Sequence, residues 1–328
     1  MYGKVCILIF MATIHKARKA HGKANSEFFL PYSWVKYELE KGYEDYLTKG
    51  KVIHCFCHKK TGHNELFDEL IELQQDKGFD LVLTYYKNDD TPDYIVERIH
   101  ADGQKVKEIV EGNGFDIARL DPFDAIEADI CIGNPEGHVF DQYFEVINQC
   151  YPNFVLWGHQ QKILRDAVRL ASMRGKVWGG NTHNKTIPFI DWEGNKDSKG
   201  GWSVFTNCNV NICKRKFFTP KKSLNDVMKS GKMYLYDNST SLYNVDYTCD
   251  IPYDYKNKLA IPVSGLFTLN PLRVKHIGNI NNKIVDESVG LFGFDKMLGR
   301  KKNGEIQEVT LGVKNGKIGA SRVVIELI

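Results

Sequence analysis

The sequence predicts an α/β fold, with a parallel sheet and helices in the first half of the chain and a mainly β, loop-rich region after it. From about residue 50 to 180, apolar strand-like runs alternate with amphipathic helical patterns, which is the order of βαβ units. After Gly179 the long helical periodicity ends, and Asn, Gly, Tyr and β-branched residues predominate. We expect three segments: 1–50, a basic segment and a helix; 51–180, the α/β core; and 181–328, a β-rich region.

The composition is that of an ordinary globular protein. The chain has 328 residues, of which 42% are hydrophobic and 26% charged, and its net charge is +3. No run approaches the roughly 18 apolar residues that span a bilayer, and the short apolar run from Val5 to Ala12 lacks a signal-peptide cleavage site. The eight cysteines show no disulfide-framework spacing. We expect a cytoplasmic protein with reduced thiols and no membrane segment.

One compact group of residues has the chemistry of metal ligands. Cys55, Cys57 and His58 lie together, with His54 and His63 nearby. A zinc site of this kind needs a second ligand pair at finger or ribbon spacing, and the sequence has none. We therefore predict no metal site.

The elements of the first half can be placed from their boundaries. Gly50 and Gly78 stop two helical patterns, and Asp102-Gly103 marks a turn between two short strands. A tight turn at 112–116 precedes a short helix that leads into a central strand. Around that strand we predict a helix over 32–47, a strand over 51–57, a helix over 64–77, strands over 79–86 and within 94–110, a strand over 153–158, a helix over 159–173 and a strand over 176–178.

The stretch from Glu127 to Tyr143 is the centre of the prediction. Its apolar run predicts a buried strand that stops at Gly133-Asn134-Pro135, and a helix follows with apolar residues on one face. An Asn-Pro pair at the carboxyl end of such a strand projects an amide and a carbonyl into the crevice where open α/β sheets bind ligands. The alternative is an ordinary turn, because Asn-Pro commonly starts turns.

The second half is predicted to be β-rich. Asn315-Gly316 indicates a hairpin in which 306–313 pairs with 318–328. Four tyrosines alternate with polar residues and could stack on bases, although core packing is the favoured interpretation: Tyr234, Tyr236, Tyr243 and Tyr247.

Basic residues are clustered in a chain whose net charge is small. The clusters are 16–19, 214–216 with 221–222, and 300–302. Each one alone fits a solvated face. Three of them in a nearly neutral chain favour a partner with a phosphate backbone.

Several short motifs, in order over residues 15 to 328, resemble the EcoRI-type adenine-specific DNA methyltransferase family. The basic 16–20 segment with Asn25-Ser26-Glu27-Phe28-Phe29, the strand 50–57 and Gly112-Asn113-Gly114-Phe115-Asp116 precede the central 127–135 stretch. The resemblance continues in the second half at Trp202 to Asn207, Asp250 to Tyr255, Ala260 to Ser264, Asn270-Pro271 and Asn315 to Lys317.

The resemblance implies a class I methyltransferase-like (Rossmann-like) sheet with helices on both faces. It implies transfer of a methyl group from S-adenosyl-L-methionine to N6 of a flipped adenine in double-stranded DNA, as in restriction-modification systems. The implied catalytic residues are Asn134 and Pro135. The implied cofactor-binding residues are Glu27, Phe28, Cys55, Cys57, Phe115, Asp116 and Gly133, and the implied DNA contacts are His138, Phe140, Trp202, Thr206, Asn207, Lys214, Arg215 and Lys216. For Trp202, Thr206 and Asn207 the alternative is an ordinary β turn with a buried Trp.

The chain departs from the family pattern in the loops that carry the chemistry. Glu136 stands where the family has a second Pro, and Gly137 stands where it has the aromatic residue that stacks on adenine. A stacking contact of about 1–3 kcal/mol is therefore missing unless His138 or Phe140 supplies it.

Three further departures fall at the expected cofactor site. The amino-terminal motif lacks its leading acid, at Ser26, and its terminal hydroxyl, at Leu30. Basic residues at 58–60 replace an acidic pattern after the first strand, and Phe115-Asp116 inverts the family order.

Three hypotheses follow. The first is an active enzyme of the family reaction with a remodelled pocket. The second is a catalytically silent relative that has lost the cofactor and binds DNA or a partner, such as a second methyltransferase subunit or a copy of itself. The third, less favoured, is altered chemistry in which Glu136 and His138 act as a new acid and base.

Overall fold

A computed structural model describes most of the chain. The described residues are 28–29, 32–40, 42–56, 65–86, 94–110, 126–135, 140–191, 196–208, 217–280, 295–309 and 312–328; for 28–29, 32, 65, 86, 110, 181–191 and 196–200 only the backbone is described.

The chain forms two compact units. Unit 1 comprises Met1–His159 and Gly180–Asn211, and unit 2 comprises Gln160–Gly179 and Ile212–Ile328. This division differs from the expected segments, because two strands that follow residue 177 extend the sheet of unit 1.

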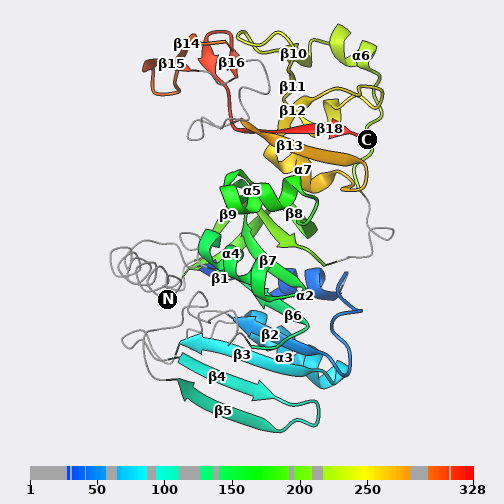
Figure 1. Ribbon diagram of the computed structural model, residues 1–328, viewed down its shortest axis with the longest axis vertical. Helices are drawn as coiled ribbons and strands as arrows, with labels where there is room; N and C mark the ends of the chain where they lie inside the picture. The colour runs from blue at the N-terminus through cyan, green and yellow to red at the C-terminus, as the bar shows by residue number, and fades with distance from the viewer. Residues whose placement is uncertain are drawn as a thin grey trace, which may run out of the picture. The chain divides into compact units, whose positions relative to one another are not determined.

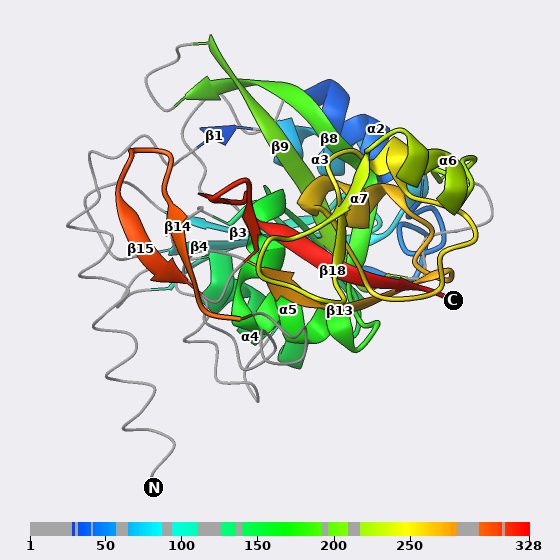
Figure 2. The ribbon, with the colours of Figure 1, turned by 90° about the horizontal axis from the view of Figure 1, so that it is seen from above.

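The described part of unit 1 is built on a nine-stranded mixed sheet in the order β1-β8-β9-β7-β6-β2-β3-β4-β5 (Figure 1). Figure 2 shows its long strands β8 and β9 side by side. The strands are β1 (Phe28–Phe29), β2 (Val52–Phe56), β3 (Asp80–Tyr86), β4 (Tyr94–Ile99), β5 (Lys105–Val110), β6 (Ile130–Gly133), β7 (Phe154–His159), β8 (Trp178–Asp191) and β9 (Lys196–Thr206); the helices of this unit are α2 (Tyr32–Glu40), α3 (Glu65–Lys77) and α4 (Phe140–Cys150).

The middle of this sheet is parallel. β7, β6, β2 and β3 are neighbours and run in one direction, whereas β4, β5 and β9 run antiparallel to their neighbours. The β2-α3-β3 and β6-α4-β7 connections are the expected βαβ units. The predicted helix over 64–77 and the turn at Asp102-Gly103 are confirmed.

Helices cover both faces of the parallel strands. Because successive side chains of a strand point to opposite faces, Ile53 and Cys55 lie in the core that α2 and α3 share with the sheet. On the other face Phe140 packs edge-on against Phe205 of β9, and Phe144 packs edge-on against Phe154 of β7. The result is a three-layer α/β arrangement.

Asp129 joins the start of β6 to the start of β2. Its carboxylate accepts hydrogen bonds from the Val52 N–H (2.9 Å) and from Lys51 Nζ (2.8 Å). The Asp129 N–H donates to the Val52 carbonyl (2.8 Å). Burial alone would raise the pKa of Asp129, but the bonds from Lys51 and Val52 lower it below its usual value. These contacts set the register of the two strands.

His54 lies in the middle of the sheet, on the face that α4 covers. Its side chain is completely buried; Nδ1 is 2.7 Å from the Tyr151 hydroxyl and Nε2 is 2.8 Å from the Thr84 hydroxyl. Burial, together with the positive charge of Arg98, lowers its pKa to about 3. The ring is therefore neutral at physiological pH and holds two strands to the chain after α4.

The described residues of unit 2 form two further sheets. One has five strands in the order β10-β11-β12-β18-β13, and the other, which we call the small sheet, has four in the order β15-β14-β17-β16. The strands are β10 (Met233–Leu235), β11 (Tyr243–Val245), β12 (Leu259–Pro262), β13 (Val274–Ile280), β14 (Met297–Arg300), β15 (Ile306–Val309), β16 (Val313–Lys314), β17 (Lys317–Ile318) and β18 (Arg322–Leu327); the helices are η2 (Gln160–Leu164), α5 (Asp166–Met173), α6 (Leu224–Lys229), η3 (Thr248–Asp250) and α7 (Val263–Thr268).

Two predicted elements differ from the structure. The helix expected over 159–173 is interrupted, because Arg165 has an extended backbone and caps a new helix, α5. The turn at Asn315-Gly316 exists, with both residues at positive φ, but it joins only β16 and β17. The long hairpin prediction was wrong, since β18 pairs with β12 and β13 and β15 pairs with β14.

Among the helices that the structure describes, none combines the length and the apolar run that crossing a lipid bilayer requires. In the same described ranges, His, Cys, Asp and Glu side chains form no group of three that could hold a metal ion.

We predict that His54 makes the protein less stable in acid. The unfolded chain takes up a proton near pH 6.5, whereas the folded chain does so only near pH 3, so the free energy of unfolding should fall by roughly a few kcal/mol as the pH drops through that window. His54→Gln, which cannot be protonated, should flatten this dependence in urea unfolding between pH 7 and pH 4. The control is His100→Gln, at an exposed position 3.7 Å from Asp80, which should keep most of the wild-type dependence. Parallel curves for wild type and His54→Gln would contradict the prediction.

Candidate functional site at the carboxyl edge of the parallel strands

The carboxyl ends of the parallel strands lie along one edge of the unit 1 sheet. β2 ends at Phe56, β3 at Tyr86, β6 at Gly133 and β7 at His159. From β2 the chain passes through α3 to β3 on one side, and from β6 it passes through α4 to β7 on the other. The order of the strands therefore reverses between β2 and β6. Open α/β sheets bind their ligands at such a point.

Asn134 and Pro135 lie at this reversal point, directly after β6. The Asn134 side chain is partly exposed and Pro135 is buried. Proline has no N–H and restricts the preceding residue to extended conformations, so the chain leaves the strand without a backbone donor at that position. Asn134 and Pro135 thus place a side-chain amide and backbone carbonyls at this edge, between β2 and β6.

Position 133 has to be a glycine because of Phe56, which lies opposite it on β2. It is the register partner of Phe56 on β2, and a Cβ atom at Gly133 would overlap the Phe56 ring. The same ring stacks on Tyr143 of α4, with 5.2 Å between centroids and 8° between planes. Phe56 therefore packs the carboxyl ends of β2 and β6 against the first turn of α4, beside Asn134.

Comparison with known protein families identifies the family to which this chain belongs. The sequence model described as adenine-specific methyltransferase EcoRI matches residues 124–327, which is more than half of the chain. The chain belongs to this family. The matched region begins just before β6, so it contains Asn134 and Pro135, the helix α4 and most of unit 2. The resemblance noted from the motifs is thereby confirmed.

A curated relative is similar over almost the full length. It is the type II methyltransferase M.MgeORF184P of Mycoplasma genitalium, which is 22% identical over 338 residues, covering 95% of this chain and 99% of the relative. No solved structure matches the chain significantly.

Two of the expected cofactor-binding residues, Cys55 and Phe28, do not show a side chain at this edge. The Cys55 side chain is completely buried in the core on the α2 and α3 face. Phe28 lies in β1, paired with Asp191 of β8, and only its backbone is described. Any contact of Cys55 or Gly133 with a ligand would have to be made by backbone atoms.

Eight of the expected site residues lie outside the described residues. They are Glu27, Cys57, Phe115 and Asp116 among the cofactor candidates, and His138, Lys214, Arg215 and Lys216 among the DNA candidates. Their roles stay predictions.

Phe140, named as a substitute for the family's stacking residue, is completely buried. It packs against Phe144 and Phe205, and a Cβ atom at Gly158 of β7 would collide with its ring. In this structure the ring has no face open to a nucleobase.

The three candidates on and after β9 make structural contacts. Asn207 bonds the start of β7, accepting from the Phe154 N–H (2.8 Å) and donating to the Pro152 carbonyl (3.0 Å). Thr206 is completely buried and donates to the Phe154 carbonyl (2.6 Å), and Trp202 is 7% exposed. Thr206 and Asn207 therefore lie at the amino end of β7, opposite the edge that carries Asn134. This placement supports the alternative interpretation, in which the motif packs the sheet.

The sequence reasoning missed three residues at the edge. Phe56 covers Gly133, Tyr143 stacks on Phe56, and His159 ends β7, next to β6. Pairing β2 with β6 in register would have pointed to Phe56, because a glycine beside a large aromatic residue on the next strand is a common packing pair.

We predict that Gly133→Ala destabilises the protein by about 1–3 kcal/mol, because the added methyl group must displace the Phe56 ring. The measurement is the free energy of unfolding in urea. In the Phe56→Leu background the same substitution should cost less, since the ring that it displaces is absent. Equal costs in the two backgrounds would show that Phe56 does not constrain Gly133.

Proposed function

We propose that this chain is a DNA adenine N6-methyltransferase that uses S-adenosylmethionine and acts on an adenine flipped out of duplex DNA. The observation that carries the proposal is the position of Asn134-Pro135 at the reversal point of the sheet, in a member of an adenine-specific methyltransferase family. The parallel strands with helices on both faces support a class I methyltransferase-like core.

The reaction needs acceptors at this position. The exocyclic amine of adenine donates its lone pair into the ring and is a poor nucleophile. The Asn134 side-chain oxygen and the Pro135 carbonyl can accept its two hydrogens as the nitrogen becomes tetrahedral. They would then stabilise charge that develops only in the transition state, which is how an enzyme raises its rate rather than only its affinity.

S-adenosylmethionine, when bound, supplies the electrophilic methyl group. Among the described residues, Asn134 fits the task of holding the amine in line, and Gly133 allows close approach of the backbone at the end of β6. The Phe56 ring excludes water from the α4 side of Gly133. Positioning of this kind supplies much of the rate of a transfer between two bound groups.

We assign target recognition to the 181–328 segment, and double-stranded DNA is the substrate that the family and the basic clusters favour. Enzymes that modify a base in duplex DNA flip it out of the helix, so the extruded adenine would be received beside Asn134.

A catalytically silent relative that binds DNA or a second subunit is the alternative. The burial of Phe140 favours it, because a buried Phe140 cannot stack on a base in place of the aromatic residue that Gly137 replaces. The two functions differ in whether the protein holds a cofactor and transfers methyl groups.

We predict that Asn134→Ala lowers methyl transfer by about 100-fold or more, because one of the two acceptors for the amine is lost. N6-methyladenine is measured by mass spectrometry of nucleosides from unmethylated genomic DNA incubated with the protein and S-adenosylmethionine. The melting temperature and the affinity for the cofactor should stay close to wild type. Full activity in the variant would refute the proposed role of Asn134.

Calorimetry separates the enzyme from the silent relative. We expect S-adenosylmethionine and S-adenosylhomocysteine to bind the wild-type protein with micromolar affinity. Absence of heat with both ligands, together with retention of the protein on duplex DNA, would refute the enzyme and support the silent relative.

A further inference from the structure

The register of the small sheet places three cations in one row. Arg300 of β14 is the partner of Lys317 of β17, and Lys317 is the partner of Lys314 of β16. Side chains of register partners point to the same face, and neighbouring strands are about 4.8 Å apart. We call Arg300, Lys317 and Lys314 the cationic row. It crosses β14, β17 and β16, although β15 lies between β14 and β16 in the sequence.

The row lies on the exposed face of the small sheet. The alternate residues on the other face are buried or partly buried in a core: Val309, Val313 and Ile318. A Cβ atom at Gly299, between Leu298 and Arg300, would meet that core. The exposed face also carries Ile306, the partner of Arg300 on β15, whose side chain is 58% exposed.

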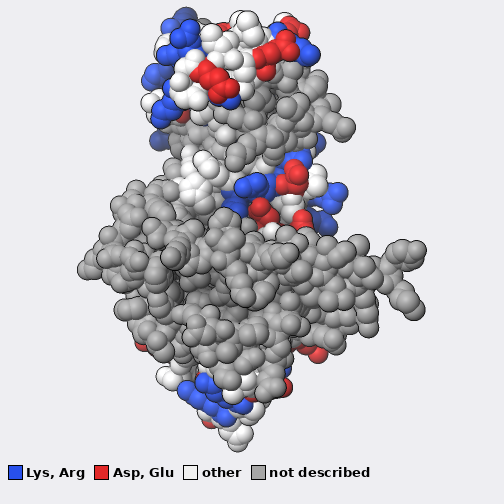
Figure 3. Space-filling view, turned by 90° about the vertical axis from the view of Figure 1, so that its left-hand side faces the viewer, with Lys and Arg blue, Asp and Glu red and all other residues white. Residues whose placement is uncertain are grey.

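Two neighbouring cations of the small sheet have carboxylate partners, whereas Lys302, in the turn between β14 and β15, is exposed and has no ion pair with a described residue. Lys301 Nζ is 3.0 Å from Glu305 and Lys296 Nζ is 3.7 Å from Glu308. Among the described residues, Arg300 and Lys317 have no such ion pair, and both are exposed. At the top of Figure 3, the level of the small sheet in Figure 1, Lys and Arg side chains lie along one side of the described surface beside two acidic groups.

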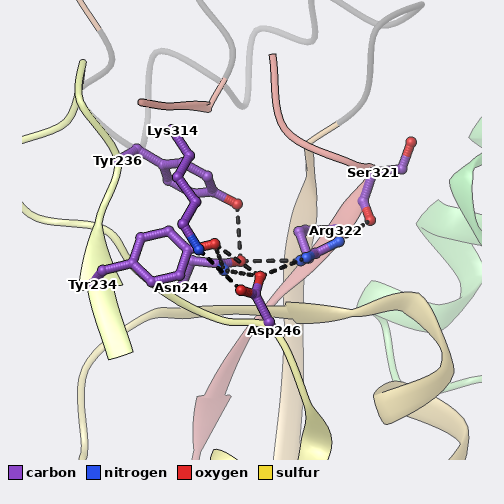
Figure 4. Close-up of polar contacts among 7 residues, drawn as sticks. All are labelled: Tyr234, Tyr236, Asn244, Asp246, Lys314, Ser321 and Arg322. Carbon is purple, nitrogen blue, oxygen red and sulfur yellow. Dashed lines mark hydrogen bonds and ion pairs between the residues drawn. The ribbon is translucent and has the colours of Figure 1, made fainter. Parts of the chain in front are cut away.

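Lys314, at the end of the row, is held in place. Its Nζ is 3.0 Å from Asp246 Oδ2 and 3.6 Å from the centre of the Tyr234 ring. Figure 4 shows Asp246 between Lys314, Tyr234 and Arg322, and Arg322 Nη2 and the Tyr234 hydroxyl also donate to it, at 3.0 and 2.8 Å. Burial alone would raise the pKa of Asp246, but these donors lower it below its usual value. Lys314 is therefore fixed in direction before any ligand arrives.

Two like charges directly opposite each other on neighbouring strands destabilise a sheet. Arg300 and Lys317 are such a pair, and neither makes an ion pair with a described residue. Glu308 lies on the same face, two residues along β15 from the partner of Arg300, but it pairs with Lys296 (3.7 Å). An anion bound across them would remove this repulsion. The spacing across three strands suits an extended polyanion better than a single small ion.

We propose that the cationic row binds the phosphates of duplex DNA and positions unit 2 on the backbone. This rests on the proposed function for its substrate, but it assigns the contact to a surface that lies far along the chain from Asn134. Phosphate contacts of this kind orient a protein on DNA without reading its sequence.

The test compares Arg300→Gln/Lys317→Gln with the wild-type, full-length protein. Binding to a fluorescein-labelled mixed-sequence DNA duplex is measured by anisotropy over a series of salt concentrations. Each phosphate contact contributes about 0.9 to the slope of log K against log salt, so the double variant should bind more weakly at low salt, with a slope smaller by about two.

The matched control removes the same charge elsewhere in unit 2. Lys229→Gln/Lys256→Gln changes two exposed cations, of which Lys229 ends α6; Figures 1 and 2 both show α6 and the small sheet on opposite sides of this unit. This variant should keep the wild-type slope. Equal slopes for both double variants, or a wild-type protein that does not bind DNA, would overturn the proposal. A loss of binding to phosphatidylserine vesicles without a loss on DNA would also overturn it, in favour of a membrane.

Stability provides a second readout. Removing the repulsion should leave the melting temperature of Arg300→Gln/Lys317→Gln equal to or above that of wild type while DNA binding weakens. A variant that loses both would mean that the row only supports the fold. Failure of the proposed function would appear in the methyl-transfer and calorimetry experiments. The anisotropy measurement is independent of these, because it uses no cofactor and does not involve Asn134.

Discussion

The pairing of β2 with β6 is the interaction on which the rest of unit 1 depends. These strands are more than 70 residues apart in the chain, and Asp129 aligns them by bonding Val52 and Lys51 at their starts. Once the starts are aligned, the ends must meet as Phe56 and Gly133. The reversal of strand order, and therefore the place where Asn134 leaves the sheet, follows from that single register.

Packing and chemistry are coupled at this edge. The Phe56 ring fills the space that a side chain at Gly133 would need, and Tyr143 holds the ring from the other side. The first turn of α4 is fixed in the same way by Phe140. Aromatic side chains therefore stabilise the frame of the proposed site, while Asn134 and Pro135 carry the acceptor groups that the proposed reaction uses. Any ring that stacks on a nucleobase has to come from elsewhere.

Unit 2 shows how a chain of small net charge can still present a basic surface. The whole sequence carries only +3, yet strand register collects Arg300, Lys317 and Lys314 on one face, and the Asp246 network directs the last of them. Among the four alternating tyrosines, Tyr236 is buried in the adjoining core and Tyr234 lies beneath the Lys314 ammonium. Core packing and cation binding are thus the roles that the structure gives these two rings.

The sequence by itself determined what depends on neighbours along the chain. Amphipathic periodicity and glycine stops located α3, α4 and the short β4-β5 hairpin, and short motifs identified the family and singled out Asn134-Pro135. Only the tertiary structure decided which strands pair. β18 joins β12 and β13 instead of β15, Asn207 turns to the start of β7, and Phe56 covers Gly133, because each of these contacts joins segments distant in sequence. Local propensity acts over a few residues, whereas register and burial are set by packing across the whole unit.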